Sequence, residues 1–251
     1  MQSKHVPSVG TRYWSALCIA SVFGANMGDF CARYLGLGHV KGLPILGVML
    51  VIIFMVESRD RYAHQTYYWL AIIVIRTAAT NLADFAAGDM KLDKLAVLAV
   101  LTILLVATVV SGRHFASWEA KGVDSKGGAS LPTTDYFYWG AMLAAGTLGT
   151  VIGDISSFSS GVGTGDASIA LCVLLGAWFY FGTGVLRAIG GYWFTIVLVR
   201  SAGTAVGDFL AGRALGLGLP TSTLITGMLM AVTLLFWKQG RFSSSVFGGA
   251  R

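Results

Sequence analysis

Four aspartates recur at one spacing inside apolar stretches, and they are the residues of this sequence best suited to chemistry. Asp29, Asp84, Asp154 and Asp208 each lie 15 residues after the tryptophan of a Tyr-Trp pair. An ionised carboxylate near the centre of a bilayer costs roughly 2.5–3.5 kcal/mol unless it faces protein or water. Carboxylates kept at such depths bind ions, carry protons or pair with another charge.

Other polar side chains precede the aspartates at helical spacing. They are Arg76 and Arg200, eight residues before an aspartate, and Thr80, Thr150 and Thr204, four residues before one. Eight residues of α-helix rise about 12 Å and turn by about 80°, so these side chains form a polar stripe along one side of a helix. The first stripe instead has Ala25 at the threonine position, and Ser21 and Gly146 stand at the arginine position of the first and third.

Two interpretations of this polar stripe compete. In one, the stripe lines a central pathway in which the carboxylates bind a cation or proton, and Arg76 and Arg200 gate it or balance its charge. In the other, each arginine pairs with an aspartate of a neighbouring helix, and the remaining aspartates cap helix ends or bind backbone amides. Four acids against two buried bases leave about two negative charges uncompensated, which favours the first interpretation.

Other kinds of chemistry find little support. The four histidines, His5, His39, His64 and His114, fall in loops or at helix ends without a second histidine four residues on, so no haem or zinc site is expected. Gly161–Asp166 has glycines like a phosphate loop but lacks its lysine. Without a Ser/His/Asp or Cys/His arrangement we expect neither an enzyme nor a cofactor. Whether a metal ion binds the aspartates stays open.

The elements that must hold these residues are long and apolar. Hydrophobic residues make up 55% of the chain, charged residues 12%, and the mean hydropathy is +0.70, whereas a soluble domain has about 25% charged residues. Eight apolar stretches long enough to cross a bilayer as helices lie at about 13–35, 42–57, 67–88, 93–111, 136–158, 167–187, 191–212 and 220–237. A lipid bilayer is therefore the expected partner.

The distribution of basic residues predicts the orientation. Of the 18 Lys and Arg residues, 11 fall on the side that holds both termini and 5 on the other. Because cytoplasmic loops carry the excess of Lys and Arg, both termini are expected in the cytoplasm. The net charge of +6 is explained in this way, and no nucleic-acid partner is expected.

Internal repetition predicts the architecture. Each aspartate belongs to a two-helix unit, and units that span the membrane twice share one orientation, so we expect four helical hairpins related by axes along the membrane normal. The arginines, present only in the second and fourth units, divide the chain into halves 1–111 and 135–251 around a polar linker, 112–134. Small residues favour close helix contacts, so the Gly- and Ala-rich odd helices should lie inside and the bulky even helices outside.

These motifs resemble a known repeat. Tyr-Trp, Arg200, Gly203, Gly207-Asp208 and Leu215–Gly218 are similar to the repeat of a group of uncharacterised bacterial integral membrane proteins, in which a Trp, Thr-Arg-Pro, Gly-Asp and Gly-Leu-Gly-rich sequence recurs in four copies. The departures are Ser201 and Thr77 at the proline position, Ala83 before Asp84, and the missing arginines of units one and three. The resemblance implies the fold and a bacterial inner-membrane location, but no activity.

We therefore expect a membrane transporter or exporter of a cation or small polar solute that uses the aspartates and arginines. The alternative is a non-catalytic scaffold or accessory subunit of a larger membrane complex, in which the aspartates are structural. The apolar outer helices would accept a second copy of the chain or a different partner equally well.

Overall fold

The computed structural model describes residues 7, 9–60, 65–116, 134–159, 161–182, 189–212 and 215–239. These residues form eight long α-helices: α1 (Thr11–Asp29), α2 (Gly38–Arg59), α3 (Gln65–Ala83), α4 (Lys94–Ala116), α5 (Tyr136–Asp154), α6 (Thr164–Phe181), α7 (Ile189–Ala211) and α8 (Gly218–Gln239). Three odd helices continue as π-helical segments, at Phe30–Tyr34, Asp84–Asp89 and Ile155–Ser159. The described part of the chain is all-helical, and all eight helices are long and apolar enough to cross a membrane.

Two helices end at other residues than their apolar stretches indicated. Helix α4 runs to Ala116, beyond the end expected at about residue 111. Arg113 and His114 lie in the last turn of α4, where basic side chains interact favourably with the helix dipole and with the last carbonyls. Helix α6 ends at Phe181, six residues before the expected end. Most of the expected linker, 117–133, and the expected end of that helix, 183–187, lie outside the described residues.

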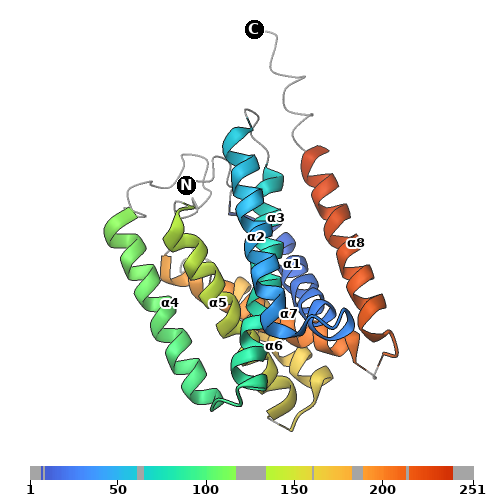
Figure 1. Cartoon of the computed structure of the whole chain (residues 1–251). Helices are drawn as coiled ribbons and strands as arrows, with labels where there is room; N and C mark the ends of the chain where they lie inside the picture. Colours follow the sequence, from blue (N-terminus) through green and yellow to red (C-terminus); the bar gives the residue numbers. More distant parts are fainter. Residues whose placement is uncertain are drawn as a thin grey trace.

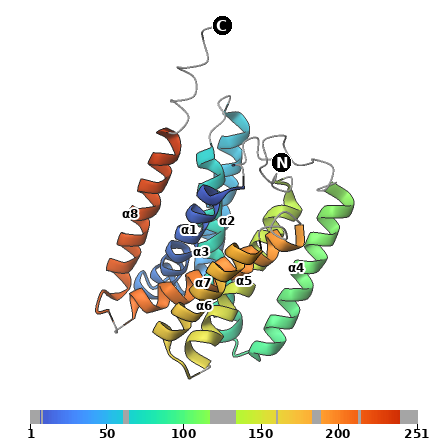
Figure 2. The ribbon, with the colours of Figure 1, turned by 180° about the vertical axis from the view of Figure 1, so that it is seen from behind.

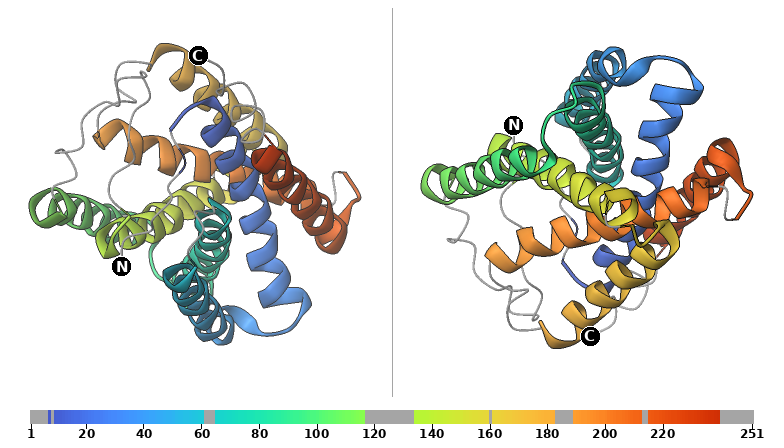
Figure 3. Two further views of the ribbon diagram at one scale, coloured as in Figure 1. Left: turned by 90° about the horizontal axis from the view of Figure 1, so that it is seen from above. Right: turned by 90° about the horizontal axis from the view of Figure 1, so that it is seen from below.

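The odd-numbered helices form the centre of the bundle. Between 50 and 67% of the residues in their most apolar stretches are buried, against 6 to 22% in the even-numbered helices. Viewed along the bundle, α1, α3, α5 and α7 meet in the middle and the even helices lie around them (Figure 3). The expected division into inner and outer helices is therefore seen, and the outer helices expose long rows of Leu, Val, Ile and Phe.

The inner helices form a closed ring in the order α1, α3, α5, α7 and back to α1. Each even helix packs chiefly against the odd helix that follows it, so α2 lies on α3, α4 on α5, α6 on α7, and α8 closes the circle on α1 (Figures 1 and 2). The main contact thus joins successive repeats rather than the two helices of one repeat, and it ties the two halves of the chain into one bundle.

The same two positions of the repeat meet at each of the four contacts between inner helices. One lies five residues before the aspartate of its helix, and the other lies eight residues before the aspartate of the next helix. The pairs are Gly24 with Arg76, Ala79 with Gly146, Gly149 with Arg200, and Gly203 with Ser21. A Cβ atom on Gly24 would lie 2.4 Å from the Cβ of Arg76, and one on Gly149 would lie 2.6 Å from the Cβ of Arg200. Glycine is required at these positions because any side chain would push the arginine-bearing helix outward. The two arginines consequently occupy opposite interfaces of the ring.

The two Leu-Gly-Leu-Gly sequences, at residues 35–38 and 215–218, form turns. Gly36 and Gly38 have φ angles of +68° and +66°, and Gly216 and Gly218 have φ angles of +65° and +70°. These left-handed conformations favour glycine, which has no Cβ to clash with the backbone. The two turns redirect the chain from the odd helices α1 and α7 into α2 and α8.

Candidate functional site

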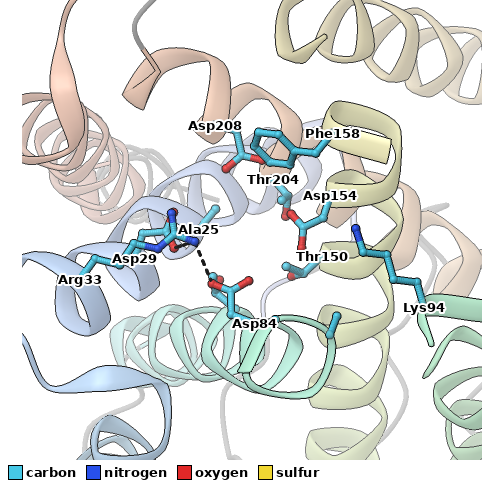
Figure 4. A pocket seen from close by; sticks show the side chains of 13 residues that line it. Ala25, Asp29, Arg33, Asp84, Lys94, Thr150, Asp154, Phe158, Thr204 and Asp208 are labelled. Atoms are coloured by element: carbon cyan, nitrogen blue, oxygen red, sulfur yellow. Dashed lines mark ion pairs between the residues drawn. The ribbon is translucent and has the colours of Figure 1, made fainter. Parts of the chain in front are cut away.

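The four repeated aspartates face a single pocket (Figure 4). Its volume is about 180 Å³. The lining residues are Ala25, Asp29, Arg33, Thr80, Asp84, Ala87, Gly88, Lys94, Thr150, Asp154, Phe158, Thr204 and Asp208. The structure thus brings together seven of the nine residues that the sequence identified, all except Arg76 and Arg200, and it adds two cations, Arg33 and Lys94.

A change in helix type occurs at three of the aspartates. Asp29 and Asp154 are the last residues of α1 and α5 before a π-helical segment, and Asp84 is the first residue of the segment after α3. π-Helical turns inside longer helices are found frequently at functional sites. The wider turn begins at the side chain that lines the pocket, so the helix geometry changes at the depth where the carboxylates converge.

Arg33 and His39 hold the carboxylates on one side of the pocket. The Nη2 atom of Arg33 lies 3.4 Å from Oδ1 of Asp29 and 3.6 Å from Oδ2 of Asp84. The His39 Nε2 atom lies 3.6 Å from the same Asp84 oxygen, and its Nδ1 atom lies 2.8 Å from Oδ2 of Asp89. Because the Arg33 side chain is 62% exposed, its attraction for the carboxylates is weakened by solvent.

Three oxygen atoms in the pocket are buried and have no hydrogen-bond partner. They belong to Asp29 (Oδ1), Thr204 (Oγ1) and Asp208 (Oδ2). The Thr204 residue is only 2% exposed. Asp29 Oδ1 has the ion-pair contact with Arg33. Buried polar atoms are nearly always hydrogen-bonded in folded proteins, so the oxygens of Thr204 and Asp208 can receive donors from a solute.

Arg200 lies beneath the pocket and links all four inner helices. It is fully buried on α7, and its Nε atom donates to Thr150 Oγ1 at 2.9 Å. Its Nη1 atom donates to the Ser21 carbonyl oxygen at 2.7 Å, and its Nη2 atom donates to Thr80 Oγ1. The planar guanidinium therefore contacts α5, α1 and α3 in three directions, which a lysine side chain could not reproduce.

Arg76 is also fully buried but has few partners. Its Nη2 atom lies 3.7 Å from the Met142 sulfur, and its Nε and Nη1 atoms have no hydrogen-bond partner. Neither buried arginine forms an ion pair with an aspartate among the described residues. The arginine–aspartate pairing considered from the sequence is therefore not what fixes this bundle.

The tyrosines of the four Tyr-Trp pairs close the other end of the inner ring. Their hydroxyl oxygens form a closed hydrogen-bonded cycle in the order Tyr13, Tyr68, Tyr138, Tyr192, with O···O distances of 2.9, 2.6, 2.9 and 2.7 Å. All four tyrosines are at most 4% exposed. Each hydroxyl can donate one hydrogen bond and accept one, so the cycle satisfies every member without water.

The tryptophans of these pairs pack inside the bundle, and three of them are buried. Trp69 is fully buried and Trp193 is 3% exposed, while Trp14 is 8% exposed. Each tryptophan packs against the tyrosine of the preceding repeat, as Trp69 does against Tyr13 at a ring-centroid distance of 5.6 Å. The tryptophans thus fill the space between inner helices instead of facing outward.

The charge balance of the site also differs from the sequence-based count. That count set four aspartates against Arg76 and Arg200, whereas Arg33 and Lys94 line the pocket as well. The pocket wall therefore carries four acids and two bases, and the two buried arginines lie deeper. Two of these four cations thus lie at the same end of the inner ring as the aspartates.

Two residues that contact the pocket carboxylates, His39 and Arg33, were not predicted as site residues. His39 has no second histidine at helical spacing, and Arg33 entered only the count of basic residues on the two sides of the membrane. The spacing of Arg33 four residues after Asp29 was the available signal. No group of three His, Cys, Asp or Glu side chains within the described residues lies close enough to hold a metal ion.

Comparison with known proteins identifies the repeat but no activity. A family model described as "Repeat of Unknown Function (DUF347)" matches the chain twice, at residues 12–61 and 191–240. The two matches cover the first and fourth units, from the start of α1 to the end of α2 and from the start of α7 to the end of α8. No curated protein and no solved structure matches the chain. The chain therefore contains two recognisable copies of a repeat whose function is unknown.

Proposed function

We propose that this protein is an integral membrane transporter or exporter of a cation or small polar solute, and that the four-aspartate pocket binds the solute. One observation carries the proposal. Carboxylates from all four inner helices line one pocket, while the two buried arginines that could neutralise them bind threonines, a carbonyl and a methionine sulfur instead. A purely structural role does not explain why four buried carboxylates surround an open space.

The proposed topology has both termini in the cytoplasm of a bacterium and the chain in its inner membrane, because Lys and Arg concentrate on the side of the termini. The aspartate pocket would then open toward the outside. Arg200, Arg76 and the tyrosine cycle separate it from the cytoplasmic end. A solute site accessible from one end and closed at the other is what alternating access requires.

The pocket favours a solute with several N–H donors over a bare metal ion. Within the described residues no three His, Cys, Asp or Glu side chains form a group that could hold a metal ion, and the oxygens of Thr204 and Asp208 without hydrogen-bond partners can accept hydrogen bonds. At about 30 Å³ for each water molecule, the 180 Å³ pocket has room for about six waters. A small organic ammonium or guanidinium cation fits this volume and this set of acceptors.

Calorimetric titration of the purified full-length protein in detergent tests the proposal. The probes are guanidinium and putrescine, with Na⁺ and Mg²⁺ for comparison. We expect Asp208→Asn to weaken binding of an organic cation by about tenfold or more, since it removes one charge from a desolvated site. The matched control is Asp166→Asn, which removes the same charge from an exposed position in the first turn of α6 and should leave the affinity unchanged.

The scaffold alternative predicts different results. If the aspartates are structural, Asp208→Asn should lower the melting temperature strongly, and neither organic cation should release heat on binding to the wild type. A folded Asp208→Asn variant with wild-type affinity would also refute the proposed site. Efflux of the bound probe from proteoliposomes then separates a transporter from a protein that only binds the cation.

A further inference from the structure

His39 connects the aspartate pocket with the exposed surface. Its imidazole lies between Asp89, whose Oδ2 is 2.8 Å from Nδ1, and Asp84, whose Oδ2 is 3.6 Å from Nε2. The Asp89 side chain is 47% exposed, whereas the side chains of His39 and Asp84 are each 15% exposed. One ring nitrogen therefore contacts a carboxylate in contact with solvent, and the other faces a carboxylate that lines the pocket.

We propose that Asp89, His39 and Asp84 form a proton relay that exchanges protons between the external solution and the aspartate pocket. Through this relay a proton would be exchanged for the transported cation. The relay rests on the proposed function, and it identifies the proton as the coupling ion. Chains of aspartate and histidine side chains commonly carry protons in pumps and transporters.

The proton transfer makes and breaks only N–H and O–H bonds. A proton taken up by Asp89 passes to Nδ1 of a His39 ring that carries its hydrogen on Nε2, which gives an imidazolium. The imidazolium then donates the Nε2 proton to Asp84 Oδ2, so that the Asp84 carboxylate becomes a carboxylic acid and Asp89 is a carboxylate again. The Nε2 atom has no hydrogen-bond partner in the structure, and a shift of about 0.7 Å brings it to hydrogen-bond distance of Asp84.

The charges around Asp84 explain why proton uptake would release a cation. Five charged or titratable groups surround His39 and its acceptor. Asp84 and Asp89 lie on the segment after α3, Asp29 ends α1, Arg33 lies on the segment that follows α1, and Asp154 ends α5. Protonation of Asp84 removes one negative charge from the pocket wall and leaves Asp29 as the carboxylate in close contact with Arg33. A bound cation then loses one of its counter-charges, so proton and cation compete for the same carboxylate.

The relay can be tested without a transported solute. Purified full-length protein is subjected to a rapid downward pH jump, and the infrared C=O stretch of protonated carboxyl groups is followed with time. Asp84→Asn identifies the part of the signal that belongs to Asp84. We expect His39→Gln to slow the appearance of the Asp84 signal by about tenfold or more, while the final amplitude of that signal is retained. The matched control is His114→Gln, an exposed histidine on α4, which should leave the rate unchanged.

Chemical rescue separates a relay from a structural role. In His39→Ala, added imidazole should restore the protonation rate of Asp84, since it can occupy the vacated space and carry the proton. An unchanged rate in His39→Gln, or a slowed rate that imidazole does not restore in His39→Ala, would overturn the proposal. Because no substrate takes part, this result stands apart from the cation titrations, which can fail or succeed on their own.

Discussion

Removal of a single hydroxyl from the tyrosine cycle gives a sharp test of the packing described here. In Tyr68→Phe, two hydrogen bonds of 2.9 and 2.6 Å are lost. One neighbouring tyrosine then keeps a donor without an acceptor, and the other keeps an acceptor without a donor. At about 0.5–1.5 kcal/mol for each bond, we expect a loss of about 1–3 kcal/mol in the free energy of unfolding.

Replacement of all four tyrosines by phenylalanine should cost much less than four times this value. The quadruple variant loses every hydrogen bond of the cycle, yet it leaves no buried polar atom unsatisfied. Exchange of both partners of a hydrogen bond for apolar groups of similar shape can be nearly neutral. The quadruple variant is therefore expected to have a stability close to that of the single variant, which a sum of independent contributions would not give.

Equilibrium unfolding of the full-length protein in detergent, with increasing denaturant, measures both effects. Tyr180→Phe serves as the control, because Tyr180 on α6 is 77% exposed and should be neutral. The reasoning fails if Tyr68→Phe is as stable as Tyr180→Phe, since the cycle would then contribute nothing. It fails equally if the quadruple variant loses about four times as much as the single one.

Three further predictions concern the inner ring and the pocket. Gly149→Ala should lower the free energy of unfolding by about 1–3 kcal/mol, because its Cβ would lie 2.7 Å from the Val197 carbonyl oxygen. The control is Gly47→Ala, where a Cβ would have no atom within 4 Å, and it should raise the free energy of unfolding by up to about 1 kcal/mol. Arg200→Lys should not preserve stability in the same unfolding assay, since a lost hydrogen bond to a charged group costs about 1.5–3 kcal/mol. Arg33→Gln should tighten guanidinium binding about two- to tenfold in the calorimeter by removing a like charge from the pocket, and weaker binding would contradict this.

Local patterns predicted the helices and the common level of the aspartates in the bundle well. The spacing from each Tyr-Trp pair to Asp29, Asp84, Asp154 and Asp208 fixes equal positions along equal helices, and four helices of the same direction bring equal positions to one level. The small residues of the odd helices likewise indicated which helices lie inside. The helix ends were less certain, because charged residues such as Arg113 can extend a helix beyond its apolar stretch.

Contacts between repeats could not be predicted in the same way. A sequence repeat does not say whether an outer helix packs on its own partner or on the next inner helix, since both arrangements bury the same apolar face. Tyr13 and Tyr192 are 179 residues apart, and only closure of the ring brings their hydroxyls together. His39 becomes a neighbour of Asp89 because the start of α2 lies beside the segment that follows α3.

Hydropathy and residue spacing act within a single helix, so they were enough to indicate apolar helices with one aspartate repeated at one level. The partners of each polar side chain depend instead on the tertiary structure. It directs Arg200 to threonines and a carbonyl, closes the tyrosines into a cycle, adds Arg33 and Lys94 to the pocket wall, and places His39 beside Asp84. The physical reason is that hydrogen bonds and ion pairs between helices depend on how the helices cross, and the crossing is fixed by the packing of all eight helices together.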